Sequence, residues 1–199
     1  MSSGYDAIYE GLIPKLAGCD FKASAERLGF EYAEGKARIR FLTRRYAITR
    51  EGVEPLDGLP ADANTRSVLI YYVLSQGSGE PENVYVLFEN IPRLTGGLGL
   101  PNRLMGRPLE KEFRTDYSQF ARAAATVGGK EEDAPPGSHF WRFQVLPKIP
   151  VRVAFYEADD EFPVGIQIML DRTSVNFLEF EVLAFMVGCL VRALVRARY

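Results

Sequence analysis

The most restrictive feature of this sequence is an uncharged apolar run in its C-terminal part, Val182–Val191 (VLAFMVGCLV). A membrane-spanning helix needs about 20 apolar residues, whereas Glu181 and Arg192 bound this run on its two sides. The run therefore predicts no transmembrane segment. It predicts a buried C-terminal helix that closes the core or pairs with a second copy of the chain as a homodimer. Asn176 and Glu179 have the spacing of a capping box and predict where the helix begins.

The composition is that of an ordinary globular protein. Of 199 residues, 47% are apolar, and 24 Lys plus Arg nearly balance 26 Asp plus Glu, for a formal charge of -2. A chain of this length buries about 70% of its unfolded surface, so a core requires no metal or disulfide. The charge balance argues against sequence-independent nucleic-acid binding. No basic and apolar leader precedes the first helical pattern, so we expect a cytoplasmic protein.

Helical and alternating patterns follow one another and predict a single α+β domain over residues 1–199, with an antiparallel sheet and several helices. Residues 51–64 are rich in Gly, Pro and acidic residues and predict a loop, which is also where a joint between two subdomains would fall. A surface loop is predicted over residues 130–137. Helices are predicted around residues 5–13, 20–29, 64–76, 108–124 and from 176 onward. Strands are predicted within residues 30–49 and at 84–88, 151–156 and 164–170.

Cysteine and histidine are scarce, and this limits the cofactors that the chain can hold. Cys19 and Cys189 are the only thiols and are far apart in sequence, so no iron-sulfur cluster is expected, because such a cluster needs about four thiolates. His139 is the only histidine, which excludes a site with several His ligands. It is a candidate acid or base, or a candidate haem or corrin ligand, although its position beside the only Trp favours a half-buried aromatic neighbour. The cofactor is unknown from sequence.

An acidic turn, Glu157–Glu161, separates the two strands of the predicted hairpin at 151–170. Carboxylates suit a hard cation such as Mg²⁺ or Ca²⁺, or a general base. If the hairpin pairs in simple register, the carboxylate beyond its second strand lies at the opposite end from the turn. A solvated turn is the alternative interpretation and the one that we favour. The candidate metal ligands are Asp159, Asp160, Glu161 and Asp171.

Two groups of basic residues are candidate binding sites. A glycine-rich segment, residues 95–101, follows a predicted strand and is flanked by arginines that suit an anion, although its spacing matches no phosphate-binding motif and a structural loop is the favoured interpretation. The candidate anion-binding residues are Arg93, Arg103 and Arg107. The predicted strands within 36–50 form an Arg-rich strand region that suits an acidic partner or RNA, and a solvated face is the favoured alternative. Its basic residues are Lys36, Arg38, Arg40, Arg44, Arg45 and Arg50.

Several short segments, in the order in which they occur, resemble the family called domain of unknown function 3786. The strongest are Leu146–Pro150 (LPKIP), Glu157–Pro163 (EADDEFP) and Met169–Asp171 (MLD), and the resemblance extends over residues 70–181. Weaker matches occur at Ile70–Leu74, Phe88–Pro92, and Arg107–Leu109 with Phe113.

The resemblance implies little about activity, because the family has none established. Its members are mostly proteins of anaerobic bacteria and archaea, and some resemble fusions to a cysteine-rich iron-sulfur segment, which implies a link to redox or one-carbon metabolism. This chain lacks that segment, and Met169 stands where the family has Phe. The leading hypothesis is a cytoplasmic accessory or ligand-binding domain for a small molecule. The alternatives are a metal-dependent enzyme that uses the acidic turn, and binding of an acidic partner or RNA.

Overall fold

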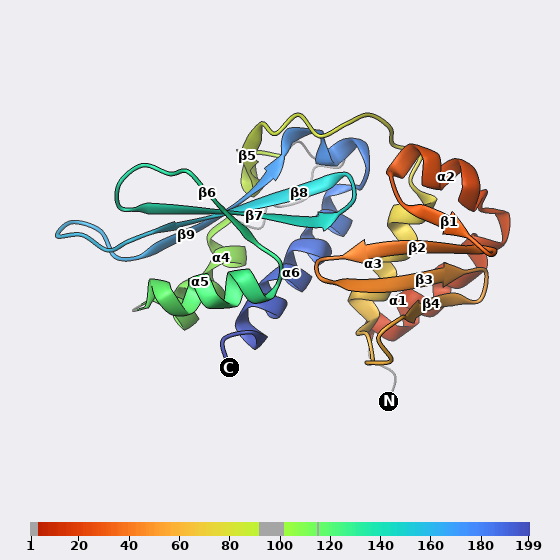
Figure 1. Ribbon diagram of the computed structural model, residues 1–199, viewed down its shortest axis with the longest axis horizontal. Coiled ribbons are helices and arrows are strands. Elements are labelled where there is room, and N and C mark those ends of the chain that lie inside the picture. The colour runs from red at the N-terminus through yellow and green to blue at the C-terminus, as the bar shows by residue number, and fades with distance from the viewer. Residues whose placement is uncertain (1–3, 92–101, 115) are drawn as a thin grey trace.

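The structure is a computed structural model that describes residues 4–91, 102–114 and 116–199. It has an α+β fold with two antiparallel sheets, one in each half of the chain, and the C-terminal helix runs between them (Figure 1). The α+β class predicted from the sequence is confirmed, with two sheets in place of one. The first sheet has four strands in the order β1-β2-β3-β4, and the second has five in the order β5-β9-β8-β7-β6.

Local sequence signals set the boundaries in the N-terminal half. Asp20 accepts hydrogen bonds from the backbone N–H groups of Lys22 and Ala23, both at 3.1 Å, and Gly29 ends that helix with φ of 75°. Glu34 and Gly35, both with positive φ, form the tight turn between the first two strands. The elements are α1 (Gly4–Leu12), a 3₁₀ turn (Ile13–Gly18), α2 (Phe21–Leu28), β1 (Glu31–Ala33), β2 (Lys36–Phe41), β3 (Arg44–Thr49), β4 (Gly52–Pro55) and α3 (Ala63–Leu74).

The C-terminal half is built on a long hairpin, as the sequence predicts. The strand Ile149–Tyr156 (β8) pairs with Gly165–Asp171 (β9), with Val153 opposite Ile168. The loop between them, residues 157–164, projects from the end of the sheet (Figure 1). The other elements are β5 (Tyr85–Leu87), a 3₁₀ turn (Phe88–Asn90), α4 (Asn102–Phe113), α5 (Tyr117–Thr126), β6 (Lys130–Glu132), β7 (Ser138–Leu146), a 3₁₀ turn (Arg172–Asn176) and α6 (Phe180–Arg196).

Some boundaries predicted from the sequence are wrong. Short strands form inside both predicted loops, β4 within 51–64 and β6 within 130–137, because each pairs with an edge of its sheet. Pro108 lies inside α4 and does not start it. Glu179 is the N-cap of α6 but its side chain makes no capping hydrogen bond, and Asn176 belongs to the preceding 3₁₀ turn, so the predicted capping box does not form.

The apolar C-terminal helix is buried, as predicted. α6 contacts α3 of the first half and α4 and α5 of the second, so its apolar face is covered within the chain. The helix therefore fills the core, and a homodimer through it stays a prediction. Among the described residues, no helix is long and apolar enough to span a membrane. The buried residues of α6 are Val182, Leu183, Met186, Val187, Cys189, Leu190, Val191 and Leu194.

The two halves are also joined by hydrogen bonds. The backbone N–H of Leu42, in the β2–β3 turn, donates to the carbonyl of Val145 in β7 at 3.0 Å. The Tyr72 hydroxyl donates to the Leu28 carbonyl at 2.7 Å and accepts from the Lys148 N–H at 3.1 Å. These bonds link the first sheet and α2 to the β7–β8 hairpin. Residues 51–64 belong to the first half, and the connection between the sheets follows α3.

Candidate functional site

The candidate functional site is an aromatic and acidic cluster around the only histidine of the chain. Alternate residues of β7 point toward α5, which places His139 and Trp141 against that helix. The imidazole ring of His139 stacks on the phenol ring of Tyr117, with centroids 3.5 Å apart and an interplanar angle of 17°. Tyr117 is the first residue of α5, whose N-cap Asp116 accepts a hydrogen bond from the Gln119 N–H at 3.0 Å. The ring stack is therefore held at a fixed helix end.

The imidazole of His139 lies between two carboxylates. Its Nε2 is 3.0 Å from Oε1 of Glu157, and its Nδ1 is 3.6 Å from Oε1 of Glu131. The Tyr117 hydroxyl donates to that Glu131 oxygen and accepts a hydrogen bond from the indole N–H of Trp141 at 3.2 Å. The His139 side chain is 26% exposed and the two carboxylates about twice that. Such an imidazole can accept or release a proton while a carboxylate stabilises its charged form.

Strand pairing assembles this cluster from distant parts of the chain. Glu131 lies directly opposite Trp141 in the β6–β7 pair. His139 is opposite Phe155 in the β7–β8 pair, and Glu157 follows two residues later, its N–H bonded to the Gly137 carbonyl at 2.9 Å. His139 is a candidate from the sequence, although a structural interpretation is favoured there, whereas Tyr117 and Glu131 are not among the candidate site residues predicted from the sequence. No sequence motif connects these residues, because β6 lies within a predicted loop.

The phenol of Tyr117 has a perturbed acidity that gives a testable prediction. Burial, followed by the hydrogen bond to Glu131, raises the pKa of Tyr117 to about 12. Because the folded state favours the neutral phenol, this group stabilises the fold. The contribution is complete below the ordinary tyrosine pKa of about 10 and is lost as the pH rises toward about 12. Trp141 is the only Trp, so its fluorescence, measured between pH 9 and 12.5 at about half-unit steps, reports ionisation of its Tyr117 partner.

We expect quenching of Trp141 with a midpoint near pH 12, a lower midpoint in Glu131→Gln, and loss of the transition in Tyr117→Phe. Far-ultraviolet circular dichroism at each pH separates this titration from unfolding. A wild-type midpoint near that of free tyrosine would contradict the hydrogen-bonded geometry.

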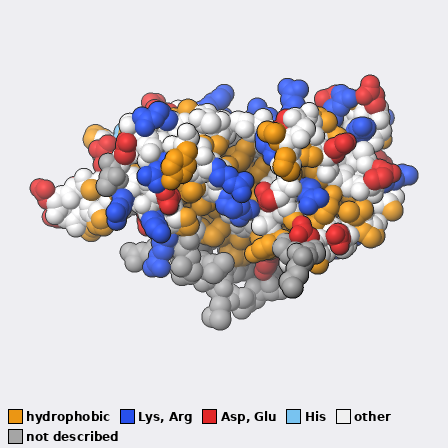
Figure 2. Space-filling view, turned by 90° about the horizontal axis from the view of Figure 1, so that it is seen from below, with side chains coloured by type: hydrophobic (Ala, Val, Ile, Leu, Met, Phe, Trp, Pro, Cys, Tyr) orange, Lys and Arg blue, Asp and Glu red, His pale blue; other side chains and the backbone are white. Residues whose placement is uncertain are grey.

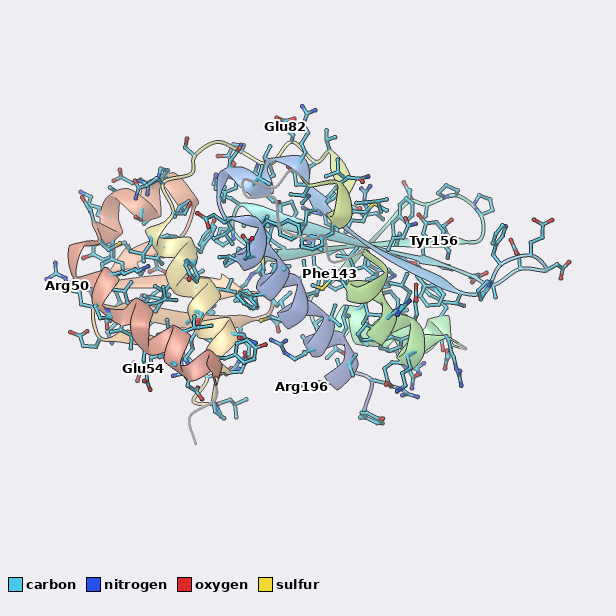
Figure 3. All side chains as sticks on the ribbon, turned by 180° about the vertical axis from the view of Figure 1, so that it is seen from behind. Arg50, Glu54, Glu82, Phe143, Tyr156 and Arg196 are labelled. Atoms are coloured by element: carbon cyan, nitrogen blue, oxygen red, sulfur yellow. The ribbon has the colours of Figure 1, made fainter. Side chains whose placement is uncertain are left out.

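A groove lies beside the cluster, between α4 and the base of the β8–β9 loop. It has a volume of about 930 Å³ and is open to solvent. Glu157 lines the groove and contacts His139, so it links the two features. Tyr156 lies on the side of the molecule from which the β8–β9 loop projects (Figure 3). Other residues that line the groove are Arg107, Glu110, Asp159 and Phe162.

The comparisons with known proteins identify a family but no activity. A sequence model described as Domain of unknown function (DUF3786) matches residues 20–193, which is most of the chain. The chain belongs to this family. The resemblance stated from the sequence is confirmed, and the match extends well beyond residues 70–181. No curated protein and no solved structure matches this DUF3786 chain. Its function must therefore be argued from the site.

The structure of this DUF3786 chain separates the residues of the predicted metal site. Asp159 accepts backbone hydrogen bonds from Glu161 at 2.9 Å and Phe162 at 2.7 Å, which lower its pKa. Asp171 ends β9, roughly 20 Å from the loop at about 3.3 Å per residue. It is fully buried and accepts hydrogen bonds from the N–H and hydroxyl of Thr173. The structure thus brings Asp159, Asp160 and Glu161 into one loop but not Asp171.

No three His, Cys, Asp or Glu side chains within the described ranges are grouped closely enough to hold a metal ion. Metal binding at the acidic turn stays a prediction. Of the predicted anion-binding residues, only Arg107 has a described side chain, which is exposed and lines the groove. Arg93 lies outside the described residues, and Arg103 is placed only as part of α4.

The Arg-rich strand region is only partly neutralised. Arg38 pairs with Glu31 at 3.0 Å and with Glu34 at 2.6 Å, and Arg44 pairs with Asp57 at 2.7 Å. The other basic side chains of the region make no ion pair with a described residue. Two of them, Arg40 on β2 and Arg45 on β3, are directly opposite each other. Binding of an acidic partner or RNA there stays a prediction. The unpaired set is Lys36, Arg40, Arg45 and Arg50.

Proposed function

We propose that this chain is a ligand-binding protein whose groove, at the base of the β8–β9 loop, takes a small organic amine. The observation that carries the proposal is the position of Glu157, which lines the groove and lies 3.0 Å from the imidazole of His139. A ligand that contacts Glu157 is therefore one side chain away from a group that can take or release a proton.

The charges and rings of the groove support an amine over an acid. Within the described part of the chain, the groove walls carry three carboxylates, Glu110, Asp159 and Glu157, against one guanidinium, Arg107. Oε1 of Glu110 accepts the Ile166 N–H at 3.2 Å, and the remaining carboxylate oxygens suit an ammonium group. The walls also include two aromatic rings, which attract cations through their faces and cover an aliphatic body. These rings belong to Tyr156 and Phe162.

The His139 cluster gives the groove a way to respond to its ligand. An ammonium group beside Glu157 competes with the imidazole for the same carboxylate, because Oε1 of Glu157 lies 3.0 Å from Nε2 of His139. Binding therefore changes the hydrogen bonding of His139 and, through the ring stack, of Tyr117 and Trp141. A cytoplasmic accessory role in anaerobic redox or one-carbon metabolism is part of the same proposal and is supported by the family resemblance alone.

Binding is tested by isothermal titration calorimetry with putrescine and lysine as amine probes and succinate as the probe of opposite charge. We expect heat from at least one amine and none from succinate. Glu157→Gln should weaken amine binding about tenfold or more, because it removes a charge-assisted hydrogen bond. Asp160→Asn is the matched control, since it removes a carboxylate from the same loop without altering the groove wall. It should bind as the wild type does.

Two outcomes would decide against the proposal. Succinate binding in preference to both amines contradicts the inferred ligand charge. Equal weakening by Glu157→Gln and Asp160→Asn indicates a general effect of the loop's charge.

The metal-dependent alternative has its own test. A rise in melting temperature with Mg²⁺ or Ca²⁺ that Asp160→Asn abolishes favours that alternative.

A further inference from the structure

A second cavity lies between the two halves, away from the His139 groove. It has a volume of about 170 Å³ and is enclosed by the β2–β3 hairpin, the start of α3 and the C-terminal part of α6. Cavities that bind drug-sized molecules are about 300–1,000 Å³, so this one suits a small ion. Lys and Arg side chains gather near the middle of the face seen from below (Figure 2). The lining residues used here are Arg44, Tyr46, Thr65, Cys189, Arg192 and Arg196.

Three guanidinium groups border this cavity. Two hydrogen bonds to the Asp57 carboxylate, at 2.7 and 2.8 Å, hold Arg44 in place. Arg192 and Arg196 are one turn apart on α6, an arrangement in which like charges repel. Arg192 is 3.7 Å from Asp62, but Arg196 makes no ion pair with a described residue and extends from the end of α6 (Figure 3). The cavity therefore has more positive than negative charge.

Tyr46 provides an independent observation at the same place. Its side chain is only 2% exposed and lines the cavity, yet its hydroxyl makes no hydrogen bond within the described part of the chain. The Arg44 guanidinium lies 5.4 Å from the centroid of the Tyr46 ring, so the two side chains border the cavity together. Burial raises the pKa of Tyr46, and the hydroxyl therefore keeps its proton and can donate it to a ligand oxygen. Because this hydroxyl has no hydrogen-bond partner among the described residues, it is available to donate to an anion bound in the cavity.

The remaining polar groups of the cavity are neutral or already bonded. The Thr65 hydroxyl hydrogen-bonds to Asp62 at 3.0 Å and lies 3.6 Å from the Cys189 sulfur. Burial raises the pKa of Cys189 to about 11, so its thiol is neutral at pH 7 and does not repel an anion. Arg192 also donates to that sulfur at 3.2 Å. Among the residues that the structure describes, Asp62 is the one carboxylate that lines the cavity, and it also caps α3.

We propose that this cavity binds a small tetrahedral oxyanion, inorganic phosphate, between the Arg192 and Arg196 guanidinium groups and the Tyr46 hydroxyl. Guanidinium groups are suited to phosphate because they present several N–H donors in one plane. The bound ion would connect the β2–β3 hairpin to α6 and so link the two halves of the chain. This site is separate from the amine groove and from the anion-binding candidates Arg93, Arg103 and Arg107, and it shares only Arg44 with the Arg-rich strand region.

The test compares low-millimolar potassium phosphate with potassium chloride at equal ionic strength and pH, by thermal unfolding and calorimetry. At tenfold excess over Kd, phosphate should raise the melting temperature by about 3–6 °C. Tyr46→Phe should fold with unchanged stability, because its hydroxyl has no partner to lose, and should bind phosphate about tenfold less tightly. Arg192→Met should weaken binding at least as much.

Matched controls separate the site from general effects of charge. Tyr32→Phe removes an exposed hydroxyl, and Arg45→Met removes an exposed guanidinium next to Arg44 but outside the cavity. Both should bind phosphate like the wild type. Equal shifts with phosphate and chloride, or full phosphate binding by Tyr46→Phe and Arg192→Met, would overturn the proposal. Tighter binding of O-phosphoserine than of inorganic phosphate would also overturn the proposal, because the cavity would then bind the phosphoryl group of a larger ligand.

Discussion

Replacing Gly77 with alanine is expected to lower the free energy of unfolding by about 3 kcal/mol, the upper end of the usual cost of overpacking. A Cβ atom at position 77 would lie 1.9 Å from the backbone oxygen of Asn176 and 2.9 Å from Cα of Phe177. Both are main-chain atoms, so no side-chain rotation relieves the overlap. The connection between the two sheets and the segment that leads into α6 would have to separate.

Thermal and urea unfolding measure this effect. For a chain of this size, a loss of about 3 kcal/mol corresponds to a fall in melting temperature of roughly 6–12 °C. Gly18→Ala is the matched control, because a Cβ at that position meets no atom within 4 Å and the residue has no positive φ. Its stability should change by no more than about 0.5 kcal/mol. Equal stability of Gly77→Ala and Gly18→Ala would contradict the close backbone approach.

Gly77 also shows what sequence patterns can and cannot reveal. Its position after an apolar helical pattern predicts a helix terminator, and α3 does end nearby, at Leu74. However, the C-cap is Ser75, and Gly77 does not have the positive φ of a helix-ending glycine. The residue is needed for a contact with a segment almost 100 positions away. Local signals placed the helix end, but no local signal shows which distant backbone will approach.

The same distinction explains the accuracy of the other predictions. The helix predicted around residues 20–29 is confirmed, since its caps, Asp20 and Gly29, depend on neighbouring residues, and the predicted β8–β9 hairpin is confirmed as well. The strand predicted at 84–88 is as apolar as a strand in the middle of a sheet, yet the strand that forms there, β5, lies at the edge of its sheet. Its residues are only partly buried, and which strands become neighbours depends on tertiary pairing that composition does not show.

The candidate site could be predicted only in part. The only histidine and the acidic turn were visible as single features, but their meeting depends on the register of β6, β7 and β8. Tyr117 looked like one member of a helical apolar face, and its contact with His139 requires α5 to cross the end of β7. In the second cavity, Arg44 appeared as one of several strand arginines. Neither cavity has a sequence motif, because each is formed by elements from separate parts of the chain.

Replacing Tyr72 with phenylalanine is expected to lower the free energy of unfolding by about 2–4 kcal/mol. The Tyr72 side chain is fully buried, and its hydroxyl serves both the Leu28 carbonyl and the Lys148 N–H. The substitution leaves the Leu28 carbonyl and the Lys148 N–H without this partner. Each unsatisfied buried group lowers the free energy of unfolding by about 1–3 kcal/mol, and by less where water reaches the group. The effect is large because one hydroxyl joins the end of α2 in the first half to the β7–β8 turn in the second.

Tyr71→Phe is the matched control, since the adjacent hydroxyl makes no hydrogen bond with a described residue. It should unfold within about 0.5 kcal/mol of the wild type in urea. Burial raises the pKa of Tyr72, so its neutral form stabilises the fold below about pH 10, and this contribution is lost at higher pH. The stability difference between wild type and Tyr72→Phe should therefore shrink above pH 10. A difference that is small at pH 7, or that grows with rising pH, would show that this hydroxyl does not join the two halves.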